Sequence, residues 1–110
     1  MGKFVKGDVV VIRFPFSDPD SAKKRPAFVI DILSDDDLIL CQITSNALED
    51  GYAIEITDDD FENGGLMVPG NVRLNKLFTV DKRAVLYKVG TLKELETQQI
   101  IDCLLNLFGG

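Results

Sequence analysis

Two apolar segments of this chain, residues 26–33 (PAFVIDIL) and 38–44 (LILCQIT), are separated by only four residues, SDDD. Both segments are rich in Ile, Val, Leu and Phe, and β-branched and aromatic residues favour extended strands. So short a connection can join antiparallel strands, whereas parallel strands need a crossover of about a dozen residues. The sequence therefore predicts an antiparallel hairpin with a tight turn at residues 34–37.

Further segments carry a similar strand-forming composition, so the chain is expected to be mainly β with a C-terminal helix. The predicted strands are residues 8–14, 52–56, 71–74, 77–80 and 84–90. Residues 15–24 contain two prolines with several Asp and Ser residues, which predicts a long polar loop. Many short strands are typical of a small, bent barrel or half-barrel. At 110 residues the chain is expected to form a single domain over residues 1–110.

The C-terminal helix is predicted from Thr91 and Glu94, which would form a capping box, to Gly109, which would end it. The residues expected to pack on the sheet are Leu92, Leu95, Ile100, Cys103, Leu104 and Leu107. Three more, Ile101, Leu105 and Phe108, make the last turns apolar nearly all round. A second apolar face implies a covering partner, often a second copy, or else a loop of this chain.

A second, shorter helix is predicted to begin within residues 57–65. Thr57 would cap it, because a Thr hydroxyl accepts from free backbone N–H groups at a helix start. Asp58 to Asp60 would lie at its positive end, and Gly64 would stop it.

The chain contains no histidine, which excludes histidine-based acid–base catalysis and most zinc sites. Its two cysteines, Cys41 and Cys103, lie among apolar residues and are expected to be buried hydrophobes, with a disulfide as the other interpretation. No apolar run approaches the ~20 residues of a membrane span, and the first residues lack a signal-peptide pattern. We expect a cytoplasmic protein without membrane association, and nothing in the sequence indicates a metal or cofactor.

The charged residues are unevenly distributed along an acidic chain of net charge −6. Residues 26–72 contain eleven Asp and Glu and no Lys or Arg. The rest of the chain carries all twelve cations against seven anions, a balance of 12 − 7 = +5. The chain can therefore present a basic face on an acidic body, and a nucleic acid is not excluded as a partner.

One group of polar residues is predicted to converge at the open end of the hairpin. Pro26 restricts Arg25 to an extended backbone at the entrance of the second strand. Pairing across the turn places residues whose numbers sum to about 71 opposite each other, so Arg25 would face Asn46 and Thr44 would lie near Ala27. A guanidinium beside Thr44, Ser45 and Asn46 resembles an oxyanion or phosphate site, the alternative being a solvated strand flank.

The sequence resembles the MazF/PemK family of toxin ribonucleases. The similarity rests on KGDVVVIRFPFSDPDSAKKRPAFVI followed by CQITS, and on VRLNKLFTVDKRAVLYKVGTL. Within the first segment, the strand opening GDV, the junction FPFS and the segment KRPA carry the similarity. It spans about residues 6–108, and the motifs are more specific in this order and spacing than separately.

The resemblance implies an SH3-like barrel of the MazF/PemK/CcdB type, usually a homodimer, that cuts single-stranded RNA without metal and binds a cognate antitoxin. It implies that Arg25 and Thr44 are catalytic, with Ser45 as the other candidate hydroxyl. Arg73 corresponds to a second RNA-contacting arginine of some members. Asn75 is an amide where some members carry an acidic residue. The residues expected to contact RNA are Lys23, Lys24, Ser45, Asn46, Arg73, Asn75 and Lys76.

The physical chemistry of RNA cleavage agrees with these assignments. The 2′-hydroxyl of RNA can attack the neighbouring phosphorus if the enzyme orients the backbone and stabilises the extra charge. Arg25 can neutralise that charge, and Thr44 can donate to a phosphate oxygen. Lys82 and Arg83, like the lysines at residues 23, 24 and 76, would attract the RNA backbone or be ordinary surface charges.

Two alternatives stay open at this point. The first is a toxin of the same fold that binds DNA gyrase, although CcdB-type toxins use a tryptophan near the C-terminus and this chain has no tryptophan. The second is a binding module that keeps the barrel without catalysis, which the net charge of −6 favours.

Overall fold

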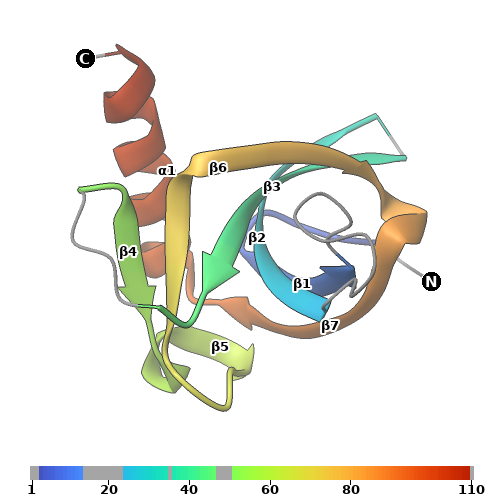
Figure 1. The fold of residues 1–110 in the computed structure, drawn as a ribbon, viewed down its shortest axis with the longest axis horizontal. Helices are drawn as coiled ribbons and strands as arrows, with labels where there is room; N and C mark the ends of the chain where they lie inside the picture. Colours follow the sequence, from blue (N-terminus) through green and yellow to red (C-terminus); the bar gives the residue numbers. More distant parts are fainter. Residues whose placement is uncertain (1–2, 14–23, 35, 47–50, 110) are drawn as a thin grey trace.

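The computed structural model describes residues 3–13, 24–34, 36–46 and 51–109, in which seven strands form one antiparallel sheet with a C-terminal helix (Figure 1). The strands are β1 Asp8–Arg13, β2 Lys24–Leu33, β3 Asp37–Thr44, β4 Ala53–Ile56, β5 Phe61–Gly64, β6 Gly70–Asp81 and β7 Val85–Leu92. Helix α1 spans Glu94–Gly109, and two 3-10 turns are η2 Asp58–Asp60 and η3 Lys82–Ala84. The predicted mainly β fold with one C-terminal helix is confirmed.

The sheet has the strand order β4-β6-β3-β2-β1-β7-β5. The hairpin of β2 and β3 and the next strand, β1, lie at its centre. The long strands β6 and β7, joined through η3, pair with the outer sides of β3 and β1. In Figure 1 the sheet curls so that β6 and β7 enclose the central strands, with α1 beside β4 and β6. This is the bent half-barrel that the short strands predict.

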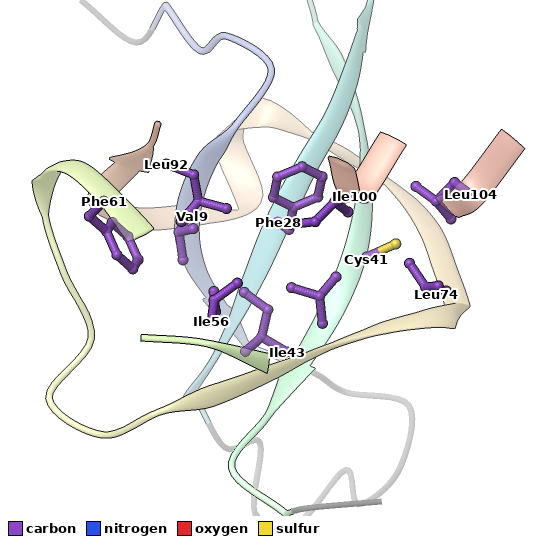
Figure 2. Close-up of a cluster of buried hydrophobic side chains, with 11 residues drawn as sticks. Val9, Phe28, Cys41, Ile43, Ile56, Phe61, Leu74, Leu92, Ile100 and Leu104 are labelled. Carbon is purple, nitrogen blue, oxygen red and sulfur yellow. The ribbon is translucent and has the colours of Figure 1, made fainter. Parts of the chain in front are cut away.

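Both faces of the central strands are buried, each against a different hydrophobic cluster. Val9, Phe28 and Cys41 belong to the cluster that includes Ile100 and Leu104 of α1, and Figure 2 shows these side chains converging. The opposite face forms a second cluster of Val10, Ile12, Ala27, Val29, Leu38 and Leu40 inside the curl. Successive side chains of a strand point to opposite faces. Two buried faces therefore explain why these segments are apolar almost without alternation.

The predicted hairpin of β2 and β3 is present, but its register at the open end differs from the prediction. Leu33 pairs with Asp37 near the turn, whereas Ala27 pairs with Gln42 beyond an irregularity between Val29 and Asp31. The pairing predicted between Arg25 and Asn46, with Thr44 near Ala27, is therefore wrong. The residue numbers of the pair Ala27 and Gln42 sum to 69, not 71, and Arg25 and Thr44 each lie two residues beyond this pair toward the open end. A bulge adds one unpaired residue to one strand, so it shifts the pairing of every residue beyond it. Because the extra residue here is also apolar, the sequence does not reveal the shift.

The segments 71–74 and 77–80, predicted as separate strands, belong to one strand, β6. Val72 pairs with Ile43 and Leu77 with Cys41, so the register shifts between these pairs. Asn75 and Lys76 lie in this irregular part of β6 and are exposed. Their polarity interrupts the apolar pattern, so the sequence indicates a break where the strand only bends.

The helix predicted within residues 57–65 is a single 3-10 turn followed by a strand. The capping box exists, since the Thr57 N–H donates to Asp60 Oδ2 at 2.9 Å. Phe61–Gly64 then forms β5 and pairs with β7, so Gly64 does not end a helix. Gly64 has a φ of +71°, which favours glycine at this position. Pairing with β7 satisfies the backbone of this segment better than a second helical turn.

Helix α1 begins three residues later than its predicted cap. Thr91 lies in β7, and its Oγ1 donates to the buried carboxylate Oδ1 of Asp8 at 2.7 Å. The predicted capping box of Thr91 and Glu94 is therefore wrong, because the Thr91 hydroxyl is engaged by Asp8. The helix does end at Gly109, as predicted.

The face that α1 buries is narrower than predicted and consists of Thr97, Ile100 and Leu104. Leu95 and Leu107 are exposed, as is Cys103, because the helix starts later and its buried stripe runs through Thr97. Leu105 and Phe108 are also exposed, as expected of the second apolar face, and its covering partner stays a prediction.

The two cysteines differ. Cys41 is fully buried, and burial raises the pKa of its thiol to about 12, whereas Cys103 is exposed. Both thiols are free, so the prediction that both are buried is wrong for Cys103. Within the described residues, no helix combines the length and the apolar character that a membrane crossing requires.

Candidate functional site

A cleft of about 220 Å³ lies at the open end of the β2–β3 hairpin, where the sequence predicts a polar site. Three segments line it: the start of β2, the end of β3 with Ser45, and the connection from β5 to β6. The lining residues are Lys24, Arg25, Pro26, Ile43, Thr44, Ser45, Leu66, Met67, Val68, Pro69 and Gly70. The fold therefore brings Arg25, Thr44 and Ser45 to one cavity, although their pairing register differs from the predicted one.

Arg25 is the second residue of β2 and lines the cleft. It pairs with Ile12 of β1 and is half-buried. The following Pro26 keeps its backbone extended. Ala27, two residues further along β2, is fully buried in the cluster inside the curl. The backbone of Arg25, near the start of β2, is therefore held by its pairing with β1 and by the following Pro26.

Thr44 is the last residue of β3 and is half-buried. Its Oγ1 accepts a hydrogen bond from the Asn46 N–H at 3.2 Å. A hydroxyl that accepts one bond keeps its own hydrogen for another acceptor. The chain after Thr44 is also held to β6, because Asn71 Nδ2 donates to the Asn46 carbonyl oxygen at 3.1 Å. Thr44 can therefore donate toward a ligand from a well-supported position.

The charge in the cleft has one sign. Lys24 and Arg25 are the only charged residues among the described residues that line it, and no carboxylate does so there. Two cations beside two hydroxyls form a set of donors that suits an oxyanion such as a phosphate. No group of three or more Cys, Asp or Glu side chains that could hold a metal ion occurs in the described part of the chain.

The other predicted RNA contacts are placed differently. Asn46, Asn75 and Lys76 are exposed but do not line the cleft, and Lys23 lies outside the described residues. Arg73 is 5% exposed in β6, where it pairs with Ala53 of β4. Neighbouring strands cover Arg73 and leave little of its side chain accessible to RNA. The predicted contact of Arg73 with RNA stays a prediction.

Lys82 and Arg83 lie in η3 near the turn of the hairpin and have carboxylate partners. Lys82 Nζ is 3.7 Å from Asp36 Oδ1, and Arg83 Nε is 3.0 Å from Asp81 Oδ1. The hydrogen bond to Arg83 holds the pKa of Asp81 below its ordinary value, and Asp81 raises the pKa of Arg83. These two cations are therefore largely compensated and contribute little to an open basic surface.

Sequence reasoning missed the apolar wall of the cleft, residues 66–69. The sequence offered a signal: Met67 and Val68 are large apolar residues directly before a Pro-Gly pair, where turn formation exposes them. Met67 is fully exposed, at 101%, and Val68 is 60% exposed. The candidate site thus combines a cationic, hydroxyl-bearing side with an apolar side.

Comparison with solved structures assigns the fold to the MazF type. The chain matches an endoribonuclease in complex with its cognate antitoxin from Mycobacterial species with a TM-score of 0.75 and 13% identity, covering 97% of this chain and 96% of that one. It matches the MazE–MazF complex of Deinococcus radiodurans with a TM-score of 0.72 and 17% identity, covering 96% and 95%. It matches the Mycobacterium tuberculosis toxin MazF-mt6 with a TM-score of 0.69 and 15% identity, covering 93% of this chain and 96% of that one.

The sequence itself matches a family over nearly its whole length. Residues 5–108 match the family described as the PemK-like, MazF-like toxin of type II toxin–antitoxin systems. The chain therefore belongs to this family and is a MazF-like toxin of a toxin–antitoxin system. A search of the curated proteins finds no match.

Proposed function

We propose that this toxin is a sequence-selective, metal-independent endoribonuclease that cleaves single-stranded RNA, with Arg25 and Thr44 as its catalytic residues. The observation that carries the proposal is that Arg25 and Thr44 line one cleft, with no carboxylate among its described lining residues. Structures titled endoribonuclease share the fold, and the family consists of MazF-like toxins. A cleft with only cations and neutral donors attracts a phosphodiester, whose charge would be repelled from the acidic remainder of the chain.

The reaction uses the substrate's own 2′-hydroxyl. The 2′-oxygen attacks the adjacent phosphorus as its proton passes to water, and the bond from phosphorus to the 5′-oxygen breaks. The 5′-oxygen takes a proton from water and leaves as a hydroxyl, so no net proton is gained or lost. The products are a 2′,3′-cyclic phosphate and a 5′-hydroxyl end. Arg25 donates to the non-bridging oxygens on which charge develops, and Thr44 donates to a phosphate oxygen or orients the 2′-oxygen. Held donors of this kind stabilise the transition state without reorganisation.

The surrounding residues have supporting roles in this proposal. Lys24 and Ser45 contact the RNA backbone inside the cleft, and Lys23, Asn46, Asn75 and Lys76 extend the contact beyond it. DNA lacks the attacking 2′-hydroxyl and is not cut. The protein acts in the cytoplasm as a homodimer, and its partner is a cognate antitoxin. A structure that shares its fold is titled an endoribonuclease in complex with its cognate antitoxin, which supports this partner.

The test is cleavage of single-stranded RNA in the presence of EDTA, with Arg25→Ala purified in parallel as the control for contaminating nuclease. We expect discrete fragments with 2′,3′-cyclic phosphate ends from the wild type only. The same sequence as DNA, or as RNA with 2′-O-methyl groups, should stay intact. Equal cleavage by both proteins, or dependence on added divalent metal, would contradict the proposal. Intact RNA together with inhibited DNA supercoiling would instead support a gyrase-binding toxin, and intact RNA with unaffected growth a non-catalytic module.

A further inference from the structure

Residues 66–69 form an apolar ridge between two clefts of opposite charge. One side faces the cleft with Lys24 and Arg25, and the other faces a cleft of about 230 Å³ lined by Thr57, Asp58 and Asp59. Met67 at the crest of this Leu66–Pro69 ridge is 101% exposed. Large apolar side chains exposed side by side next to a polar cleft are typical of a contact surface.

The Leu66–Pro69 ridge is anchored at both of its ends. Leu66 is half-buried and packs against the hydrophobic cluster below α1. At the other end, a Cβ on Gly70 would lie 2.7 Å from Ile43 Cγ2 and 3.1 Å from Leu66 Cδ1, so glycine permits this close approach. Pro69 fixes its own φ angle and restricts Val68. An anchored apolar surface loses little conformational entropy when a ligand packs on it.

Electrostatics decides which part of an RNA strand meets the ridge. Phosphates are attracted to Lys24 and Arg25 on one side and repelled by Asp58 and Asp59 on the other. The sugar–phosphate backbone therefore stays on the basic side of the ridge. The bases, which are uncharged and project away from the phosphates, lie toward Met67 and Val68. A methionine thioether packs well against an aromatic ring and adapts to its shape.

We propose that the Leu66–Pro69 ridge is a nucleobase platform, on which Met67 packs against a base next to the scissile phosphate and contributes to base selectivity. This proposal rests on the proposed RNA cleavage. An apolar protein segment would also fit an exposed methionine. The RNA base is favoured because the ridge is continuous with the cationic cleft and is only a few side chains wide, whereas stable protein contacts bury about 800 Å² on each partner.

Binding measurements can test the platform independently of cleavage. The probes are a short, mixed-sequence single-stranded RNA with 2′-O-methyl groups, which blocks the reaction, and an abasic phosphodiester chain of equal length. We expect Met67→Ser to bind the RNA several-fold more weakly, up to about tenfold, because a thioether–aromatic contact contributes a factor in this range. Binding of the abasic chain should be unchanged. Met67→Leu, which keeps an apolar side chain, should stay within about twofold of the wild type.

Val5→Ser provides a matched control, because Val5 is 55% exposed and lines neither cleft. Unchanged RNA binding by Met67→Ser would overturn the platform, as would an equal loss for RNA and the abasic chain. With a randomised RNA pool, Met67→Ser should relax the preference at one position next to the cut, whereas Val5→Ser should not. If the wild type cuts no RNA, the proposed catalysis has failed while the binding comparison still decides the role of the ridge.

Discussion

The two ends of the β2–β3 hairpin both carry basic residues, but they use them differently. At the turn, Lys82 and Arg83 have Asp36 and Asp81 as partners. At the open end, Lys24 and Arg25 line a cleft with Thr44 and Ser45 and with no carboxylate among its described lining residues. The cations at the turn are therefore paired with carboxylates of the chain itself, whereas we propose that those at the open end bind an anion from outside.

This difference shows that the number of cations in a segment is a poor guide to an anion site. Lys82-Arg83 and Lys24-Arg25 are equally basic pairs in the sequence. What separates them is the neighbouring chain, since η3 follows directly on Asp81 and lies beside the acidic turn. Each end therefore supplies a control for the other.

The largest effect is expected at Arg25. Arg25→Ala should lower kcat/KM for RNA by about 10³-fold, because one arginine on the charge of a phosphoryl transition state commonly contributes that much. The matched control Arg83→Ala should remain within about twofold of the wild type. Single-turnover cleavage of a labelled RNA measures both. A comparable loss in Arg83→Ala would remove the distinction between the two ends.

Thr44 should follow with a loss of about 10²-fold in kcat for Thr44→Ala, as expected for one donor to a developing oxyanion. Thr44→Ser retains the hydroxyl and should recover most of the activity, while Ser45→Ala should cost less than Thr44→Ala. The readout is kcat and KM determined separately. A larger loss for Ser45→Ala would transfer the catalytic role to that hydroxyl.

Lys24 is expected to have a smaller effect, on binding alone. Lys24→Ala should weaken RNA binding a few-fold and reduce the slope of log K against log salt by about 0.7, the value for one phosphate contact of a single strand. Lys82→Ala, the control at the turn, should leave the slope unchanged. Titrations of a 2′-O-methyl RNA at several salt concentrations measure both slopes. Equal slopes for Lys24→Ala and the wild type would remove Lys24 from the RNA contact.

The smallest effect concerns the paired charges at the turn. The pKa of Asp81 is lowered mainly by the hydrogen bond from the Arg83 side chain, so its ionised form stabilises the folded state. That contribution is present above the ordinary pKa of 3.8 and is lost as the pH falls through the lowered folded value. Asp81→Asn should therefore have a slightly lower Tm than the wild type at pH 6, with the difference vanishing near pH 2. A constant difference across this range would exclude the ion pair as its cause.

Much of the candidate site is visible in the sequence because it depends on local rules. Pro26 constrains Arg25, Thr44 ends an apolar run, and the short turn at residues 34–37 forces the two strands together. The register between them is not visible, because the irregularity between Val29 and Asp31 has no marker such as glycine or proline in an apolar segment. The sequence also does not show that Met67 forms an apolar wall of the site, because Met67 becomes part of the site only by lining the same cleft as Arg25.

The sequence by itself determined strands β1 to β4 and β7, the central hairpin, and the C-terminal helix with its end at Gly109, since these follow from side-chain composition and turn chemistry within a few residues. The tertiary structure alone decided the unbroken course of β6, the pairing of β5 with β7 and the engagement of Thr91 by Asp8. It also exposed Cys103, which the sequence predicts to be buried. The physical reason is that these outcomes depend on partners distant in the chain, whose backbone pairing and burial outweigh local preference.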